Sequence, residues 1–206
     1  KQTYVKLLQY DEFGQRKHLE LGNGGKTDYQ YEPDTRRLHS VKTTLTSRKT
    51  GATRVIQNLV YTYDEGRPGV GNVTLLVDAL GVSTHAAAGA VTQTFTYDAL
   101  YRLTKATGDA DAAPRTRDTY DSVFEYDTIH NLTRKKQVHA IVEPSGQVVK
   151  HAQSNHDFGY LYPGPAPHRA SLIGDTSLFY DGNGNTTREE TTPPGLGPKV
   201  RRYGWN

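Results

Sequence analysis

Three features of the sequence predict an all-β fold built from repeated hairpins. The 206 residues include 14 Tyr, 20 Gly and 10 Pro, residue types that favour strands and turns. An apolar or aromatic residue followed two positions later by an aromatic one recurs along the chain. Helical signals are scarce, because the short runs Ala86–Ala88 and Asp109–Ala113 are flanked by Gly or Pro and are expected to be loops.

The repeat begins with this aromatic pair and continues with an acid. The pairs are Leu8/Tyr10, Tyr29/Tyr31, Tyr61/Tyr63, Phe95/Tyr97, Phe124/Tyr126, Tyr160/Tyr162, Leu178/Tyr180 and Tyr203/Trp205. An acid follows the second aromatic at Asp11, Glu32, Asp64, Asp98, Asp127 and Asp181, whereas Pro163 and Asn206 take the other two places. Successive aromatics lie 18 to 36 residues apart, so the hairpins or the loops that join them must differ in length.

A second half-motif follows a few residues later. Its clearest copies are Arg36-Arg37-Leu38, Arg102-Leu103-Thr104, Asn131-Leu132-Thr133 and Asn185-Thr186-Thr187, with Asn72-Val73-Thr74 displaced by a longer connection. Leu, Val and Thr suit the start of a returning strand. One repeat is therefore expected to be strand, turn and strand.

The side chains of the repeat suggest how it is held together. An aromatic pair spaced by two lies on one face of a strand, where a Tyr ring packs while its hydroxyl stays in water. The Asp carboxylate is expected to accept a hydrogen bond from the backbone N–H two residues ahead, and Gly14, Gly182 and Gly184 supply turn positions with positive φ.

An isolated hairpin is only marginally stable, so neighbouring hairpins are expected to pair edge to edge. We also expect their Tyr rings to stack, at about 0.2–1 kcal/mol for each cross-strand pair. The predicted structural ladder consists of Tyr10, Asp11, Tyr63, Asp64, Tyr97, Asp98, Tyr126, Asp127, Tyr180 and Asp181. Gln137–Lys150 is expected to form a longer hairpin around Glu143–Gly146, and Pro163–Pro167 and Thr191–Pro198 are expected to be loops.

Composition and motifs argue against several other functions. The net charge is +3 and dispersed, with Lys135-Lys136 and Arg201-Arg202 as the densest basic spots, so no nucleic-acid surface is expected. The absence of Cys excludes disulfides and thiolate metal sites within the chain, and no apolar run approaches the roughly 20 residues of a membrane span. No Gly-x-Ser-x-Gly or phosphate-binding motif is present, and we expect no catalytic residue, cofactor or metal.

Two patterns in the sequence could indicate a binding site, but each has a simpler structural explanation. Asp181, Asn183 and Asn185 alternate like the first half of a calcium loop, but no Glu follows at the twelfth position. His151, His156 and His168 lie in one stretch, with His156-Asp157 as an orienting pair, yet their spacing does not predict convergence on one metal or substrate. A turn and packed or solvated histidines are the preferred interpretations.

The repeated motifs resemble the RHS/YD-repeat family. Phe95–Thr104 is similar to the consensus aromatic-x-Tyr-Asp-x-x-Gly-Arg-Leu-Thr, with Tyr101 at the Gly position. Tyr126–Thr133 has His130 at that position, and Tyr180–Asn185 keeps Gly. The run Ala166-Pro167-His168-Arg169 is similar to a stretch of bacterial RHS proteins. The resemblance extends from Tyr10 to Asn206, and the family includes bacterial Rhs polymorphic toxins, BC components of insecticidal toxin complexes and animal teneurins.

The resemblance implies a β-sheet strip that spirals into a hollow shell, which in toxin members encloses a C-terminal toxic domain. Residues 1–206 are then expected to be one RHS/YD-repeat segment of a much longer chain, because the sequence starts at Lys1 and contains no Met. The implied function is non-catalytic and structural, in a protein that is secreted or displayed on a bacterial surface. The implied partners are neighbouring RHS repeats and an enclosed C-terminal toxin domain or components of a secretion apparatus. The alternative is a cell-surface adhesion or carbohydrate-binding scaffold, since exposed Tyr faces can stack on sugars. No Asp-Pro-x-Gly pattern is present, so the family's self-cleavage is not implied.

Overall fold

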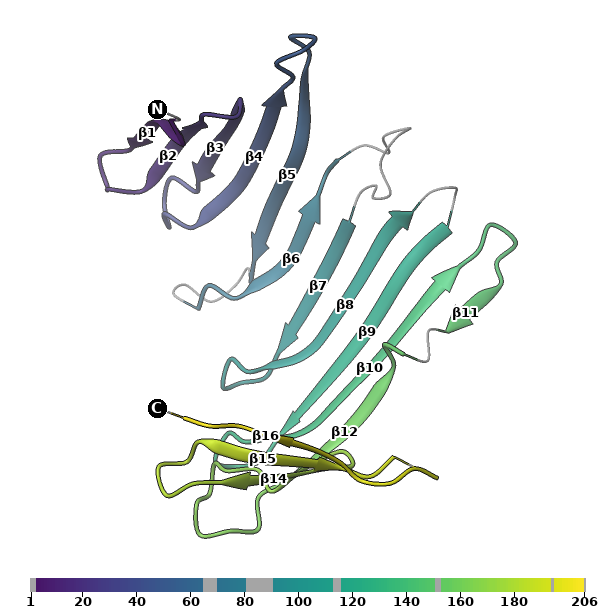
Figure 1. Cartoon of the computed structure of the whole chain (residues 1–206). Coiled ribbons are helices and arrows are strands. Elements are labelled where there is room, and N and C mark those ends of the chain that lie inside the picture. Colours follow the sequence, from purple (N-terminus) through teal and green to yellow (C-terminus); the bar gives the residue numbers. More distant parts are fainter. Residues whose placement is uncertain are drawn as a thin grey trace. The chain divides into compact units, whose positions relative to one another are not determined.

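The computed structural model describes residues 3–64, 70–80, 91–112, 116–150, 153–193 and 195–205 (Figure 1). Sixteen strands and no helix occur in these ranges, which confirms the all-β prediction. Consequently, no helix there is long and apolar enough to cross a membrane. The expected loop at Ala86–Ala88, together with His151 and Asn206, lies outside the described residues.

The strands follow one another along the whole chain. They are β1 (Val5–Tyr10), β2 (Arg16–Leu21), β3 (Gly25–Tyr31), β4 (Leu38–Thr46), β5 (Thr53–Tyr63), β6 (Val73–Asp78), β7 (Val91–Tyr97), β8 (Leu103–Ala112), β9 (Thr116–Tyr126), β10 (Leu132–Val142), β11 (Val148–Lys150), β12 (His156–Leu161), β13 (Leu172–Ile173), β14 (Thr176–Tyr180), β15 (Thr186–Thr191) and β16 (Lys199–Arg202).

Almost every strand pairs with its neighbours in sequence. The hydrogen-bonded order runs from β1 to β10 and then from β12 to β16, with β11 paired to β10 off this path. Residues 1–120 and 140–149 form one compact unit, and residues 121–139 and 150–206 form a second. The strand-turn-strand repeat is therefore a β-meander, in which each YD turn joins two adjacent antiparallel strands.

The hairpin of β7 and β8 illustrates why these residues form strands. Burial alternates along β7, so that Phe95 and Tyr97 lie on its half-buried face. Phe95 pairs with Ala106 and Tyr97 with Leu103, and a register shift separates Thr96 from Tyr97. The same irregularity occurs at Tyr10, Tyr31, Tyr63 and Tyr180. A β-bulge thus accompanies the tyrosine before the turn, where it locally disrupts the backbone ladder.

The predicted loop at Asp109–Ala113 was wrong, because β8 continues through Ala112. The ring of Tyr120 covers the bare backbone of Gly108, where a Cβ atom would come within 2.0 Å of the ring. The Tyr120 hydroxyl then accepts a hydrogen bond of 3.0 Å from the Gln93 side-chain amide. An aromatic ring from β9 therefore reaches across β8 to β7 and supports a run of weak strand formers.

The longer hairpin within Gln137–Lys150 is confirmed as β10 and β11. Its turn is closed by bonds from the Glu143 N–H to the Gln147 carbonyl and from the Gly146 N–H to the Glu143 carbonyl. The first half of β10 instead pairs with β12, through residues 134–137. β10 therefore pairs with both β11 and β12, and β11 lies off the main path of strands.

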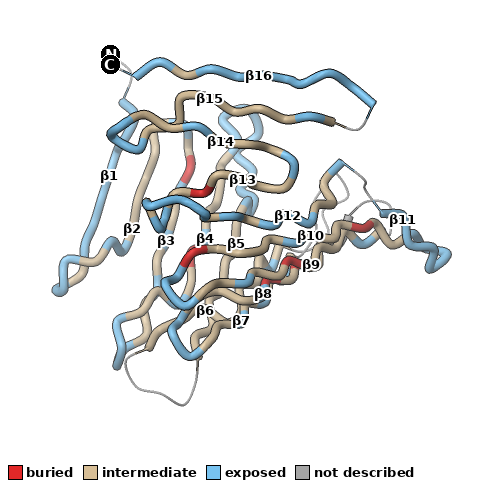
Figure 2. The backbone as a smooth tube through the Cα atoms, turned by 90° about the horizontal axis from the view of Figure 1, so that it is seen from below, coloured by how far each residue is buried: buried red, intermediate tan, exposed pale blue. Residues whose placement is uncertain are grey.

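Nearly all described residues of both units are half-buried or exposed, in similar proportions (Figure 2). Among the described residues, the buried apolar side chains are Val41, Ala106, Ala140 and Ala170, and the buried polar ones are Ser122 and Asn131. None of the large side chains there is fully buried. Hydrogen bonds and half-covered rings must therefore supply much of the specificity that a thick apolar core supplies in a globular domain.

Candidate functional site: the aromatic–acid step

At six of the eight repeats, the aromatic residue before the turn donates a hydrogen bond to the preceding hairpin. This contact is described for five tyrosines and for Trp205, with donor–acceptor distances of 2.7–2.9 Å. The donor–acceptor pairs are Tyr31 to the Arg16 carbonyl, Tyr63 to Leu38, Tyr97 to Val73, Tyr162 to Leu132, Tyr180 to Ala170 and the Trp205 indole N–H to Thr186. The donor joins two successive repeats, and we call this contact the cross-repeat bond.

The acceptors share a position in the fold. Five of the six are the first residue of a returning strand, and Ala170 lies two residues before β13. At Arg16, Leu38, Val73 and Thr186 a bulge interrupts the ladder of the earlier hairpin, so a backbone carbonyl there needs a donor from elsewhere. The cross-repeat bond therefore fixes one hairpin against the beginning of the previous returning strand, whatever the length of chain between them.

The tyrosine hydroxyls were expected to stay in water, and this was wrong for the five donors. Burial raises the pKa of Tyr63, Tyr97 and Tyr162, so each hydroxyl remains protonated and able to donate. The expected stacking of rings does not couple these tyrosines either. Arginines cover two of the rings, with Arg37 5.3 Å from the Tyr63 centroid and Arg169 5.2 Å from that of Tyr180. These distances are within the range of cation–π contacts.

The acid after the tyrosine organises the turn through its own backbone. Its Oδ1 accepts bonds of 2.8–3.0 Å from the N–H groups two and four residues ahead. The donors are Phe13 and Gln15 at Asp11, Leu100 and Arg102 at Asp98, Ile129 and Asn131 at Asp127, and Asn183 and Asn185 at Asp181. The carboxylate is thus engaged by the backbone amides of its own turn. Among the described residues, no group of three or more His, Cys, Asp or Glu side chains is arranged to hold a metal ion.

The second oxygen of the acid explains the first residue of the second half-motif. Oδ2 of Asp98 accepts from Nε of Arg102 at 2.7 Å, and Oδ2 of Asp181 accepts from the Asn185 amide at 3.0 Å. The backbone bond from Arg102 is the main cause that lowers the pKa of Asp98, and the Asn185 amide has that role for Asp181. Arg or Asn stands four residues after the acid because either can reach back to the carboxylate.

The turn keeps one backbone geometry even where its glycine is replaced. Gly14 and Gly184 have φ of 76° and 86°, and Tyr101 and His130 occupy the same position with φ of 63° and 71°. The left-handed region is costly for residues with a Cβ atom. The hydrogen bonds of the acid therefore hold Tyr101 and His130 in a conformation that their side chains disfavour.

Longer connections use the same elements with modifications. The Asp64 carboxylate accepts from the Gly71 N–H at 3.1 Å and from the Asn72 amide at 3.4 Å, across a turn of which residues 65–69 are not described. Glu32 takes the place of the Asp in the hairpin of β3 and β4, where its backbone N–H donates to the Arg37 carbonyl at 2.8 Å.

Two other tyrosines of the predicted ladder differ in exposure. Tyr10 is 56% exposed at the end of β1, and Tyr126 is half-buried at the end of β9.

The loop after Tyr162 has Pro163 instead of an acid, and it is closed by the previous repeat. The Asn131 amide donates to the Pro167 carbonyl at 2.7 Å and to Oδ2 of Asp127 at 2.9 Å. Its Oδ1 lies 2.7 Å from Nδ1 of His168. Asn131, which is only 7% exposed, therefore links its own turn to this loop. Burial raises the pKa of Asp127, but the hydrogen bonds from Asn131 outweigh it and the net shift is downward.

The histidine stretch does not form a shared site among the described residues. His156 stacks on Phe158 with ring centroids 4.7 Å apart, whereas the Asp157 carboxylate binds Arg134 through two bonds of 2.7 Å. The alternative of an orienting pair of His156 and Asp157 is not realised, because the Asp157 carboxylate binds Arg134 on β10. His168 instead belongs to the loop closure at Asn131.

Comparison with known proteins identifies relatives of these repeats. No family model matches the chain. Two curated relatives from Yersinia entomophaga, toxin subunit YenC1 and toxin subunit YenC2, are 38% and 36% identical over 109 residues. The aligned region is 52% of this chain and 11% of each relative. The chain thus matches a small part of the length of these toxin subunits.

Solved structures extend the match to nearly the whole chain. The Photorhabdus luminescens Tc holotoxin pore contains a chain that is 26% identical and has a TM-score of 0.61, over 98% of this chain and 11% of that one. The crystal structure of TcdB2–TccC3 without its hypervariable C-terminal region gives 25% identity and a TM-score of 0.63 over the same shares. The resemblance to RHS/YD-repeat proteins is confirmed. The relatives of these YD repeats are subunits of Tc toxins.

Proposed function

We propose that this chain is a non-catalytic wall segment of an RHS-repeat shell that encloses a C-terminal toxin domain and helps deliver it. The observation that carries the proposal is the cross-repeat bond, which recurs although the aromatics are 18 to 36 residues apart. A wall must continue across irregular repeats, and a contact that depends only on the ends of strands allows this. The segment would belong to a longer, secreted chain, with neighbouring repeats and the enclosed domain as its partners.

At two tyrosines of the predicted ladder, Tyr63 and Tyr180, the contacts favour a wall over the alternative of a carbohydrate-binding scaffold. A sugar ring would need an open aromatic face, but the ring of Tyr63 lies beneath Arg37 and that of Tyr180 beneath Arg169. The hydroxyls of both tyrosines are already engaged by backbone carbonyls. Binding of glycans at these positions would have to displace both contacts. A glycan array probed with the chain is expected to show no specific binding.

Protease protection in the full natural chain tests the proposal. The C-terminal region should resist a broad-specificity protease while the repeats are folded, and it should become susceptible once they unfold. Tyr97→Ala, which removes one cross-repeat bond, should increase the rate of cleavage of that region, whereas Tyr101→Ala should not. Tyr101 is a suitable control because it is 54% exposed. Equal cleavage of the C-terminal region in the folded chain and in an isolated C-terminal fragment would contradict enclosure.

A further inference from the structure

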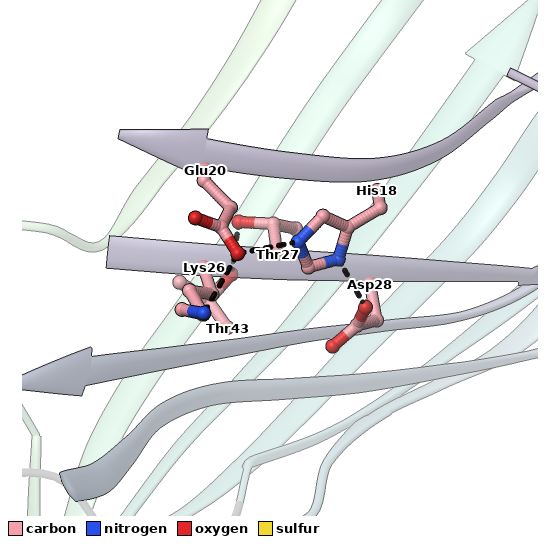
Figure 3. A network of polar contacts seen from close by, with 6 residues as sticks. All are labelled: His18, Glu20, Lys26, Thr27, Asp28 and Thr43. Atoms are coloured by element: carbon pink, nitrogen blue, oxygen red, sulfur yellow. Dashed lines mark hydrogen bonds and ion pairs between the residues drawn. The ribbon is translucent and has the colours of Figure 1, made fainter. Parts of the chain in front are cut away.

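A cluster of charged side chains joins β2 to β3 on one face of the hairpin (Figure 3). Nδ1 of His18 lies 2.6 Å from Oδ1 of Asp28, and Nε2 of the same ring lies 3.3 Å from Oε1 of Glu20. Lys26 approaches that Glu20 oxygen at 2.7 Å. Both nitrogens of one imidazole therefore face carboxylate oxygens.

This geometry suits only one protonation state of the ring. Imidazolium carries two N–H donors and satisfies both carboxylates, whereas neutral imidazole has one donor and one lone pair. A lone pair facing a carboxylate oxygen is repelled, whichever nitrogen loses its proton. We propose that His18 is a proton-dependent clamp, which holds β2 against β3 as the imidazolium and loosens this hairpin when the ring is deprotonated.

The charged groups around the ring lie on its own strand and on β3 and β4, whereas β1 supplies none. Glu20 lies two residues away on β2, and Asp28 is the cross-strand partner of His18 on β3. On the other side, β1 places the uncharged Gln9 opposite His18. β4 places Lys42 opposite Asp28, and Arg16 lies two residues before His18 on β2.

These cations reduce the negative field at the ring but do not replace the imidazolium. Lys26 approaches Glu20 at Oε1, which leaves the carboxylate shared between an ammonium and the ring. The side chain of Glu20 is 26% exposed and that of His18 only 19% exposed, so water substitutes poorly for a lost ring N–H at the Glu20 end. The hydrogen bond to Asp28 is the main cause that raises the pKa of His18.

The direction of the pH effect follows from this raised pKa. A histidine with a higher pKa in the folded state stabilises the fold fully below its unfolded value of about 6.5. The stabilisation is lost as the pH rises through the folded value. The clamp therefore opens with increasing alkalinity, the opposite direction from the aspartate turns.

Hydrogen exchange of the full natural chain tests the clamp. Peptides that cover 16–31 are followed between about pH 6 and about pH 9, and each rate is divided by that of the same peptide in the unfolded chain. Protection of this hairpin is expected to fall about threefold or more as pH rises. The hairpin of β14 and β15, whose residues 176–191 contain no histidine, is the internal control and should show no such change.

Two variants separate the clamp from other effects of pH. His18→Gln should give weak protection at both ends of the range and no pH dependence, with the control hairpin unchanged. Asp28→Asn should reduce the pH dependence, because the ring loses its closest carboxylate. The proposal is overturned if His18→Gln retains the pH dependence of the natural chain, or if the natural chain shows none. It does not depend on what the repeats enclose.

Discussion

The turn Asp98–Arg102 and the loop Pro163–Ser171 perform the same task with different chemistry. In the first, one carboxylate accepts two backbone N–H groups and the Arg102 side chain, so the turn is closed by residues within five positions. In the second, Pro163 has no carboxylate, and the Asn131 side chain of the preceding hairpin binds the Pro167 carbonyl and the His168 ring. Both are nevertheless preceded by a tyrosine that donates to a carbonyl of the earlier repeat.

The difference shows which part of the repeat is constant. The acid is one way to close a turn, and the chain replaces it where an adjacent side chain supplies the hydrogen bonds. The aromatic donor is kept in both places. The cross-repeat bond is therefore the feature that we expect to be most sensitive to substitution.

Removing the aromatic side chain should have the largest effect, and a similar one in both regions. Tyr97→Ala and Tyr162→Ala are each expected to lower the free energy of unfolding by about 3 kcal/mol, near the lower limit for a buried aromatic because both rings are half-covered. Tyr101→Ala should cost far less, since that side chain is 54% exposed. Chemical denaturation measures all three, and a loss for Tyr101→Ala as large as that for Tyr97→Ala would contradict the assignment.

Truncating the Asn131 side chain should distinguish a turn closed by its own residues from the loop 163–171, which is closed by the preceding hairpin. Asn131→Ala removes the side-chain hydrogen bonds of Asn131 to the Pro167 carbonyl, to Oδ2 of Asp127 and to the His168 ring, and we expect a loss of about 2 kcal/mol in the free energy of unfolding. Asn185→Ala is the matched control, because its amide contacts only Asp181 in its own turn, and about 1 kcal/mol is expected. Hydrogen exchange should detect loosening of 163–171 in Asn131→Ala alone. Faster hydrogen exchange confined to residues 127–131 would argue against the claim that Asn131 holds both its own turn and the loop 163–171.

The self-closed turn should be sensitive to acid. Hydrogen bonds lower the pKa of Asp98 in the folded state, so its contribution is present above the unfolded value of about 3.9 and is lost as the pH falls through the folded value. Asp98→Asn keeps an acceptor but loses the charge, and it should flatten the stability profile below about pH 4. Pro163 has no carboxyl, so acid can loosen its loop only through the contact of Asn131 with Asp127. An unchanged acid profile in Asp98→Asn would count against this cause.

The smallest effect should come from relieving backbone strain in the same turn. Tyr101→Gly removes the penalty of a positive φ, partly offset by the greater freedom of glycine in the unfolded chain. We expect stabilisation of about 0.5 kcal/mol, visible as a small rise in Tm. Asn183→Gly, at the position before the left-handed Gly184, is the control. It should lower the free energy of unfolding or leave it unchanged.

The sequence predicted the features that depend on neighbouring residues. The Asp98 turn is encoded in five consecutive positions, so the bond from the N–H two residues ahead could be anticipated. The partner of the Tyr97 hydroxyl could not, because it lies 24 residues earlier and depends on the register between two hairpins. Asn131 and His168 are 37 residues apart for the same reason. The strand at 109–112 was missed because Tyr120, from the next strand, supports it.

The most direct test of the cross-repeat bond removes only a hydroxyl. Tyr97→Phe retains the ring and deletes the 2.9 Å bond to the Val73 carbonyl, while Tyr101→Phe deletes a hydroxyl from an exposed ring. Measured by chemical denaturation, Tyr97→Phe is expected to lose about 1 kcal/mol and Tyr101→Phe almost nothing. Equal stability of Tyr97→Phe and the natural chain would contradict the claim that this bond holds successive hairpins together.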